Sequence, residues 1–97
     1  MKKIDVIVPS YNEEESLPLF YEALKKTGEL LPDYEMRFIF VDDGSSDGTL
    51  DVIRSLAEND ETVKYVSFSR NFGKEAAMYA GFENVTGDYI AVMDADL

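Results

Sequence analysis

The sequence contains no cysteine and no histidine. Without cysteine, it can form no disulfide bond, thiolate metal site or thiol nucleophile, which fits a reducing compartment. Without histidine, imidazole catalysis is excluded for this segment. Any chemistry in this segment must therefore come from other side chains.

Basic residues are scarce, because 9 lysines and arginines stand against 20 aspartates and glutamates. The net charge of -11 argues against a nucleic-acid partner, since binding a phosphate backbone requires a basic surface. A metal ion, or an anion bridged by a cation, remains compatible with this charge. We therefore expect no nucleic acid among the partners.

Long hydrophobic runs are also missing. The first apolar stretch contains Asp5 and ends at Pro9, so it is too short for a signal peptide or a membrane span. We expect no membrane segment in this chain. A length of 97 residues with 45% hydrophobic content suits one small globular domain.

Short apolar, β-branched runs alternate with segments of helical spacing. The expected strands are residues 4–8, 36–41, 63–68 and 88–93, and the expected helices are residues 14–26, 47–58 and 74–84. This β-α-β-α-β-α-β order predicts an α/β fold, in which helices cover both faces of a parallel sheet. We find no repeat, linker or low-complexity tract.

Helical spacing also predicts which residues are buried. The first helix should end near Gly28, and Ser46 or Asp47 should cap the second. The third helix has a face of small residues that could lie close against the sheet. The residues expected to face inward are Leu17, Phe20, Tyr21 and Leu24 in the first helix and Ala76, Ala77, Ala80 and Gly81 in the third.

The loops that follow the strands are polar. They comprise residues 9–14, 42–49, 69–74 and 94–96. Open α/β folds bind ligands at the carboxyl ends of their strands, so these loops should form one site. The last loop places Asp94 and Asp96 one residue apart at a strand end, and carboxylate oxygens suit hard divalent cations.

Each loop also has a simpler interpretation. Residues 42–45 could form only a turn and a helix cap, and residues 9–12 only a loop with a capping asparagine. Tyr11 could instead stack on a flat ring. Arg70 and Lys74 could offset an acidic surface or meet a diphosphate. These alternatives stay open at the level of single loops.

Several phosphate-binding motifs do not fit. A dinucleotide-binding fingerprint needs glycines after the first strand, where residues 9–13 read PSYNE, and a P-loop needs glycine at Phe68. A response-regulator phosphoacceptor would place its acids after the first and third strands, not the second and fourth. A phosphatase using Asp94 and Asp96 as its D-x-D is a weaker alternative, because that motif normally follows a first strand.

Taken together, the four loops resemble the family 2 glycosyltransferases, which are inverting enzymes. Residues 6–14 (VIVPSYNEE), 41–49 (VDDGSSDGT) and 93–97 (MDADL) are similar to the opening loop, the second loop and the D-x-D metal motif of that family. Residues 69–77 (SRNFGKEAA) resemble the dolichol-phosphate mannosyltransferases and bactoprenol glucosyltransferases, which transfer sugars to polyprenyl phosphates. The implied fold is the Rossmann-like N-terminal half of the nucleotide-diphospho-sugar transferase fold called GT-A.

The resemblance also implies a nucleotide-binding pocket. Pro9, Tyr11 and Glu13 match positions that line the base pocket. Asp43, with Val41 beside it, matches the acid that contacts the base or ribose, and Asp42 is the less certain member of that pair.

The D-x-D motif is expected to address the ribose and the metal. It comprises Asp94, Ala95 and Asp96, and the implied cofactor is Mg²⁺ or Mn²⁺ held by the donor's diphosphate. Asp96 is the expected direct ligand, and Asp94 assists it. Arg70 and Lys74 are weaker candidates for contacts to the diphosphate.

The resemblance implies transfer of a hexose from UDP-hexose or GDP-hexose to a polyprenyl phosphate or glycan, with inversion. Family members continue well past the D-x-D motif, so we expect residues 1–97 to be the donor-binding half, with the general base beyond Leu97. The chain alone should bind nucleotide without transferring sugar. The expected location is cytoplasmic, at the inner membrane face for a longer parent. A competing interpretation is a non-enzymatic module that self-associates through an exposed sheet edge.

Overall fold

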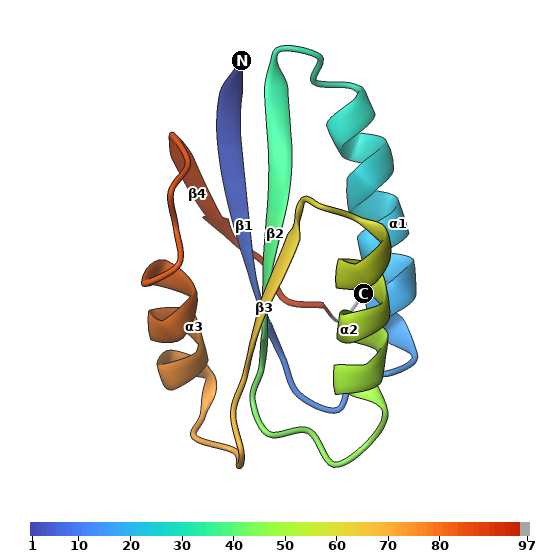
Figure 1. Ribbon diagram of the computed structural model, residues 1–97, viewed down its shortest axis with the longest axis vertical. Coiled ribbons are helices and arrows are strands. Elements are labelled where there is room, and N and C mark those ends of the chain that lie inside the picture. The colour runs from blue at the N-terminus through green and yellow to red at the C-terminus, as the bar shows by residue number, and fades with distance from the viewer. Residues whose placement is uncertain (96–97) are drawn as a thin grey trace.

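The computed structural model describes residues 1–95 and confirms the alternating order of strands and helices (Figure 1). Its elements are β1 (Lys2–Ser10), α1 (Ser16–Glu29), β2 (Tyr34–Asp42), α2 (Thr49–Asn59), β3 (Val63–Ser67), α3 (Lys74–Phe82) and β4 (Tyr89–Val92). One predicted end is wrong, because Gly28 lies inside α1. The N–H groups of Leu30 and Leu31 donate to the carbonyls of Thr27 and Gly28 and prolong the last turn.

The four strands form one parallel sheet, as predicted, and the structure gives their order in it as β3-β2-β1-β4. In the register of β1 and β2, Pro9 lies opposite Val41 and Ser10 opposite Asp42. Beyond β4, the N–H of Met93 donates to the carbonyl of Ile7 at 2.9 Å. The loops after β1 and β2 therefore leave the sheet at the same level, and the segment after β4 leaves at the same end of the sheet.

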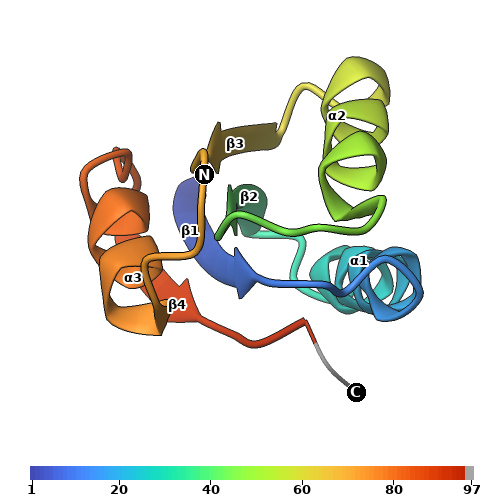
Figure 2. The same cartoon turned by 90° about the horizontal axis from the view of Figure 1, so that it is seen from below.

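Helices cover both faces of the sheet, because successive strand residues point to opposite sides. Figure 2 shows α1 and α2 on one side and α3 on the other. The core beneath α1 and α2 comprises Val6, Val8, Leu17, Phe20, Leu24, Phe38, Phe40, Ile53, Val63 and Ala95. The core beneath α3 comprises Ile7, Ile39, Val41 and Ala77.

The buried face of α1 is as predicted, except at one tyrosine. Leu17, Phe20 and Leu24 are buried. Tyr21 packs against the same core but is only partly buried, and its hydroxyl donates to the carboxylate of Asp60. Burial, together with this hydrogen bond and the negative charge, raises the pKa of Tyr21 to about 12.

Small residues bring α3 close to the sheet, as the sequence predicted. A Cβ atom on Gly81 would lie 2.4 Å from Cγ2 of Ile7. Ile7 is fully buried and branches at its own Cβ, so it cannot swing aside as a flexible chain end would. Glycine at this position therefore sets the distance between helix and sheet.

The first prediction follows from that contact. Gly81→Ala is expected to lower the free energy of unfolding by about 1–3 kcal/mol, because overpacking outweighs the better helix propensity of alanine. The matched control is Gly28→Ala, whose Cβ would lie 3.7 Å from Cβ of Met36 and should raise stability by about 0.5–1 kcal/mol. Urea unfolding followed by circular dichroism measures both; equal effects would contradict the packing argument.

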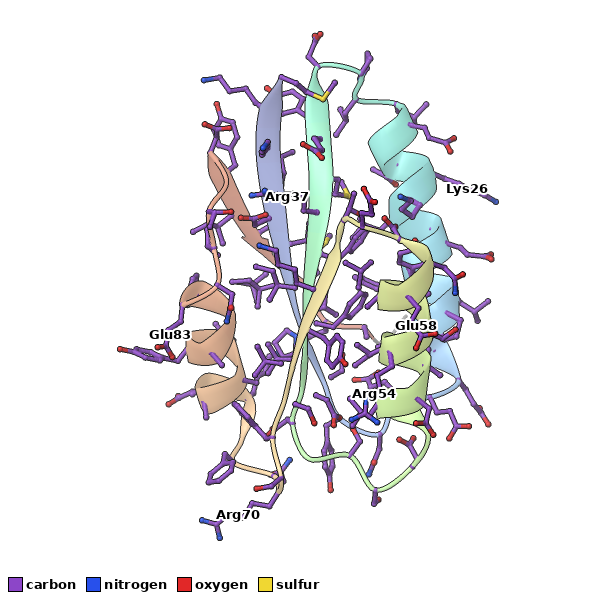
Figure 3. The ribbon with its side chains drawn as sticks, in the orientation of Figure 1. Lys26, Arg37, Arg54, Glu58, Arg70 and Glu83 are labelled. Atoms are coloured by element: carbon purple, nitrogen blue, oxygen red, sulfur yellow. The ribbon has the colours of Figure 1, made fainter. Side chains whose placement is uncertain are left out.

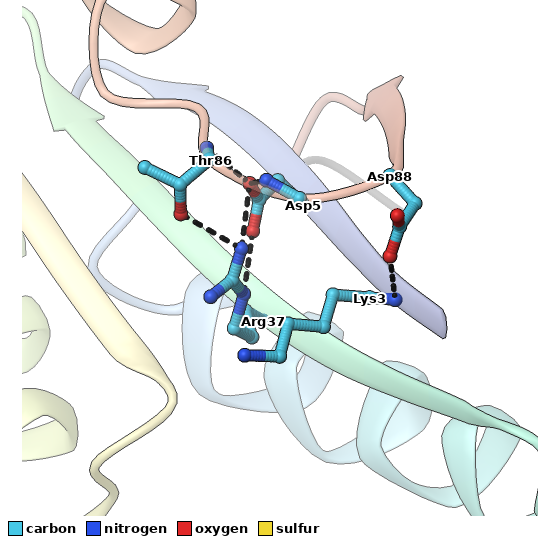
Figure 4. Close-up of polar contacts among 6 residues, drawn as sticks. Lys3, Asp5, Arg37, Thr86 and Asp88 are labelled. Atoms are coloured by element: carbon cyan, nitrogen blue, oxygen red, sulfur yellow. Dashed lines mark hydrogen bonds and ion pairs between the residues drawn. The ribbon is translucent and has the colours of Figure 1, made fainter. Parts of the chain in front are cut away.

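A buried ion pair holds the segment that leads into β4. The guanidinium of Arg37 donates from Nε and Nη2 to the two carboxylate oxygens of Asp5, at 2.8 and 3.0 Å (Figure 4). The N–H groups of Thr86 and Gly87 donate to the same carboxylate at 2.9 and 2.7 Å. The carboxylate thus ties the start of β4 to the centre of the sheet.

Strand β4 lies at an edge of the sheet and carries apolar side chains that face solvent. Tyr89, Ile90 and Val92 are all exposed, which is the kind of apolar edge that the self-association hypothesis requires. Self-association itself stays a prediction. Within residues 1–95, no helix combines the length and the apolar character needed to cross a membrane.

Candidate functional site

The loops after β1 and β2 are joined by hydrogen bonds. The side-chain oxygen of Asn12 accepts the N–H of Ser46 at 2.9 Å, and the N–H of Asn12 donates to the hydroxyl of Ser45 at 2.9 Å. Asn12 adopts φ 52, a left-handed conformation that asparagine tolerates. Asn12 therefore bridges two loops instead of capping α1, whose N-terminus shows no side-chain cap.

Two further bonds join the same loops. The N–H of Glu13 donates to the hydroxyl of Thr49 at 2.8 Å, and the N–H of Gly48 donates to Oε1 of Glu14 at 2.7 Å. The backbone around Tyr11 and Glu13 is thereby held against the start of α2. Sequence patterns did not indicate this bridge, because it joins residues 34 and 36 positions apart.

Neither residue expected to cap α2 is its N-cap, which is Gly48, although the Asp47 carboxylate accepts a hydrogen bond from the first residue of the helix. One carboxylate oxygen of Asp47 accepts the N–H of Thr49 at 2.9 Å, whereas the hydroxyl of Ser46 lies 3.3 Å from Asn12 Oδ1. Burial alone would raise the pKa of Asp47. Hydrogen bonds from Thr49 and from the N–H of Glu14 outweigh it and hold that pKa below its usual value.

Asp43 anchors the loop that precedes α3. Its carboxylate accepts the N–H groups of Phe72 at 2.9 Å and Gly73 at 3.1 Å, and the side-chain amide of Asn71 at 3.1 Å. The residue is only 4% exposed. Asp43 therefore fixes the backbone directly before Lys74.

Asp42 has a local role. Its Oδ1 accepts the N–H of Ser45 at 3.2 Å, which is the turn interaction that the simpler interpretation of this loop predicted. Gly44 completes the turn with φ 70, and a Cβ there would lie 2.2 Å from the carbonyl carbon of Arg70. Only glycine allows the loops after β2 and β3 to approach this closely.

A cavity of about 120 Å³ lies among the loops after β1, β2 and β4 and the start of α3. Six of the predicted site residues line it, together with Ser10, which the sequence did not single out. Ser10 is buried, and its hydroxyl donates to the carbonyl of Val8. The lining residues are Pro9, Ser10, Tyr11, Glu13, Asp43, Lys74 and Asp94.

Four predicted site residues lie elsewhere among the described residues. Val41 and Ala95 are fully buried in the two cores, so neither side chain faces the cavity. Asp42 makes the turn described above. Arg70 lies at the far end of its loop, with its guanidinium carbon 4.6 Å from the ring centre of Phe72 (Figure 3).

Ala95 has a positional effect although it does not face the cavity. Figure 2 shows the chain after β4 turning towards α1, and Ala95 joins the core on that side of the sheet. Burial of this small side chain anchors the chain directly after Asp94, whose own side chain is exposed at the cavity. Asp96, the expected direct metal ligand, lies outside the described residues.

A cation already lies against Asp94. The ammonium nitrogen of Lys74 is 2.7 Å from Oδ1 of Asp94, and both side chains are about half exposed. Both members of the pair line the cavity, so the Asp94 carboxylate there is paired with a lysine ammonium.

The described residues fit a metal that arrives with a phosphate ligand. Within residues 1–95, no group of three or more acidic side chains gathers closely enough to hold an ion. Asp94 offers one exposed carboxylate at the cavity. Mg²⁺ is commonly bound through one or two carboxylates plus the phosphates of a substrate, so this donor set suits a metal–diphosphate complex.

Comparison with known proteins agrees with the geometry. The bactoprenol glucosyl transferase of Shigella phage SfX is 46% identical over 95 residues, which cover 98% of this chain and 31% of that protein. The undecaprenyl-phosphate 4-deoxy-4-formamido-L-arabinose transferase of Photorhabdus laumondii is 44% identical over 99 residues, covering 100% of this chain and 30% of that protein. The chain thus spans about 30% of the length of these curated relatives.

A solved structure with the same fold is the mannosyltransferase PcManGT from Pyrobaculum calidifontis, in complex with GDP-Man and Mn²⁺. It is 32% identical with a TM-score of 0.75, and the match covers 98% of this chain and 28% of that one. The predicted Rossmann-like GT-A fold is therefore confirmed. Residues 5–97 match the glycosyl transferase family 2. Since this match takes in every strand and all four loops, the chain belongs to glycosyltransferase family 2.

Proposed function

We propose that this chain supplies the donor-binding part of a glycosyltransferase that moves a hexose from UDP-hexose or GDP-hexose to a polyprenyl phosphate or glycan, with inversion. The observation that carries the proposal is the cavity, where six of the residues expected in the donor site lie together. The names of the relatives, which include bactoprenol and undecaprenyl phosphate, support the lipid acceptor. The family match disfavours a D-x-D phosphatase.

The residues that line the cavity suit contacts to part of a nucleotide, since a volume of about 120 Å³ does not enclose a whole one. Tyr11 is 47% exposed and lines the cavity, so its ring is available to stack on a flat base. Within the described residues, Oδ2 of Asp43 accepts two hydrogen bonds, from Asn71 and Gly73, and Oδ1 accepts one, from Phe72. Since each carboxylate oxygen has two lone pairs, Oδ1 can accept one more bond from a base or ribose donor.

The leaving group determines the chemistry of the site. Departure of a nucleoside diphosphate builds up negative charge, which a bound divalent metal stabilises without proton transfer. We propose that Asp94 and Asp96 hold this metal and that Lys74 contacts the diphosphate. Inverting attack needs an acceptor placed opposite the leaving group. We propose that the base which assists it lies outside this chain, consistent with the greater length of the relatives.

Titration calorimetry tests the donor site. The chain should bind UDP or GDP more tightly with Mn²⁺ than without it, and Asp94→Asn should weaken binding about tenfold or more by removing a charged contact. The control is Asp33→Asn, which changes the charge equally but precedes β2 at the other end of the sheet. Binding of neither nucleotide would overturn the proposal. We expect no sugar transfer by the 97-residue chain alone.

The names of the relatives also bear on where the protein acts. We propose that a longer protein containing this chain acts at the cytoplasmic membrane face, because its relatives are named for lipid acceptors. The exposed apolar edge at β4 favours the alternative of a self-associating module. Light scattering, together with the nucleotide titration, distinguishes the donor-binding enzyme from the self-associating module. Dimers that form without metal, in a chain with no nucleotide affinity, would favour the module.

A further inference from the structure

The ion pair between Lys74 and Asp94 sits where the proposed metal and diphosphate would bind. Its atoms are 2.7 Å apart, and its members come from the start of α3 and the loop after β4. Both line the same cavity as Glu13 and Asp43. A cation of the protein therefore already neutralises the carboxylate that the incoming metal requires.

The backbone on each side of this pair is anchored. Asp43 accepts the N–H groups of the two residues before Lys74, and Ala95 is buried directly after Asp94. The pair itself is exposed, with side-chain accessibilities of 57% and 51%. Exposed ion pairs contribute little to stability, so the two side-chain ends can separate at low cost while the main chain stays in place.

We propose that Lys74 is an exchangeable counter-ion that makes this site selective for the complex of a divalent metal with a nucleoside diphosphate over either component alone. The proposal rests on the proposed function and adds a specificity-determining role for Lys74. A metal that arrives alone must displace the ammonium and then meets its repulsion. A metal that arrives with a diphosphate brings phosphate oxygens, to which the ammonium can transfer.

The converse case has the same physical basis. A diphosphate without metal meets Glu13, Asp43 and Asp94 in a chain of net charge -11, so its binding is opposed. Within residues 1–95, too few carboxylates gather to hold a metal without help. Each component therefore improves the site for the other, and by thermodynamic linkage the two effects are equal.

The test measures that coupling. Free Mn²⁺ is followed by electron paramagnetic resonance while the 97-residue chain is titrated with and without saturating UDP, and again with GDP. The coupling factor is the ratio of the two Mn²⁺ dissociation constants. In Lys74→Gln, Mn²⁺ alone should bind severalfold more tightly and the coupling factor should fall about tenfold, within the usual range for coupled sites.

Three further variants separate charge from structure. Lys74→Arg keeps the charge and should retain the coupling, whereas Lys74→Ala should behave like Lys74→Gln. The control is Lys26→Gln, a lysine in the last turn of α1 and far from the cavity (Figure 3). Its coupling factor should equal that of the unaltered chain. Circular dichroism confirms that each variant is folded.

Two outcomes would overturn the proposal in distinguishable ways. If a nucleotide binds with Mn²⁺ but Lys74→Gln leaves the coupling factor unchanged, the counter-ion role is wrong and the donor site stands. If neither UDP nor GDP binds to the unaltered chain with Mn²⁺, the proposed function fails and the counter-ion role fails with it.

Discussion

Replacing Asp5 with alanine is expected to lower the free energy of unfolding by about 3 kcal/mol, the lower end of the range for removing one partner of a buried ion pair. Asp5 is 2% exposed and accepts both guanidinium contacts of Arg37. Without the carboxylate, the guanidinium of Arg37 and the N–H groups of Thr86 and Gly87 lose an acceptor. Urea unfolding followed by circular dichroism measures the loss.

A second aspartate near β4 provides the control. Asp88 is exposed, and its carboxylate accepts a single N–H, that of Lys3, at 2.8 Å. Asp88→Ala should therefore cost much less stability than Asp5→Ala. Equal losses would show that the buried network does not hold β4.

The same carboxylate predicts how stability depends on pH. Burial by itself raises the pKa of Asp5, but hydrogen bonds from Thr86, Arg37 and Gly87 outweigh it and hold that pKa below its usual value. A depressed pKa in the folded state stabilises the fold above the unfolded pKa of about 4. This contribution is lost as the pH falls below that value. Asp5→Asn, which does not titrate, should flatten the decline of Tm between about pH 4 and pH 2.

The layout of the fold could be predicted because it depends on local periodicity. Alternating apolar runs and helical spacing specify the order of elements, and parallel pairing then brings the loops to one edge of the sheet. The small-residue face of α3 was also predictable, since Ala76, Ala77, Ala80 and Gly81 recur at helical spacing within one element. These inferences need only the side chains of one element at a time.

The contacts that join distant segments could not be predicted in this way. Asp5 looks like an interruption of an apolar strand, and its partners lie 32 residues away in Arg37 and 81 away in Thr86. The D-x-D spacing indicated a metal motif, but it could not show that Ala95 is buried in the core. The sequence of the loop after β3 likewise could not show that Arg70 lies on the ring of Phe72, away from the cavity.

Asp43 is the residue at which fold and proposed function meet most directly. Asp43→Ala is expected to lower the free energy of unfolding by about 3 kcal/mol, because three N–H donors lose a charged acceptor and each such loss costs about 1–3 kcal/mol, with partial compensation by water. The affected donors belong to Asn71, Phe72 and Gly73. Nucleotide binding should fall below detection by calorimetry, since the same side chain lines the cavity.

The neighbouring acid is the matched control for this prediction. Asp42→Ala removes the side-chain hydrogen bond to the N–H of Ser45 and should cost about 1 kcal/mol, while nucleotide affinity stays within about threefold. Asn71→Ala removes a single donor to Asp43 and should leave its carboxylate in place. If Asp42→Ala matches Asp43→Ala in both measurements, the distinction between a turn aspartate and a site aspartate is wrong.

The folded fraction of the Asp43→Ala variant should also lose metal–nucleotide coupling, for a reason that separates it from Lys74→Gln. Removing the carboxylate frees the backbone before Lys74, so the ammonium is present but no longer held opposite Asp94. Mn²⁺ alone should then bind no more tightly than to the unaltered chain, because the positive charge remains near the site. Tighter Mn²⁺ binding in Asp43→Ala would contradict this argument, since the variant keeps the ammonium and removes a carboxylate that lines the cavity.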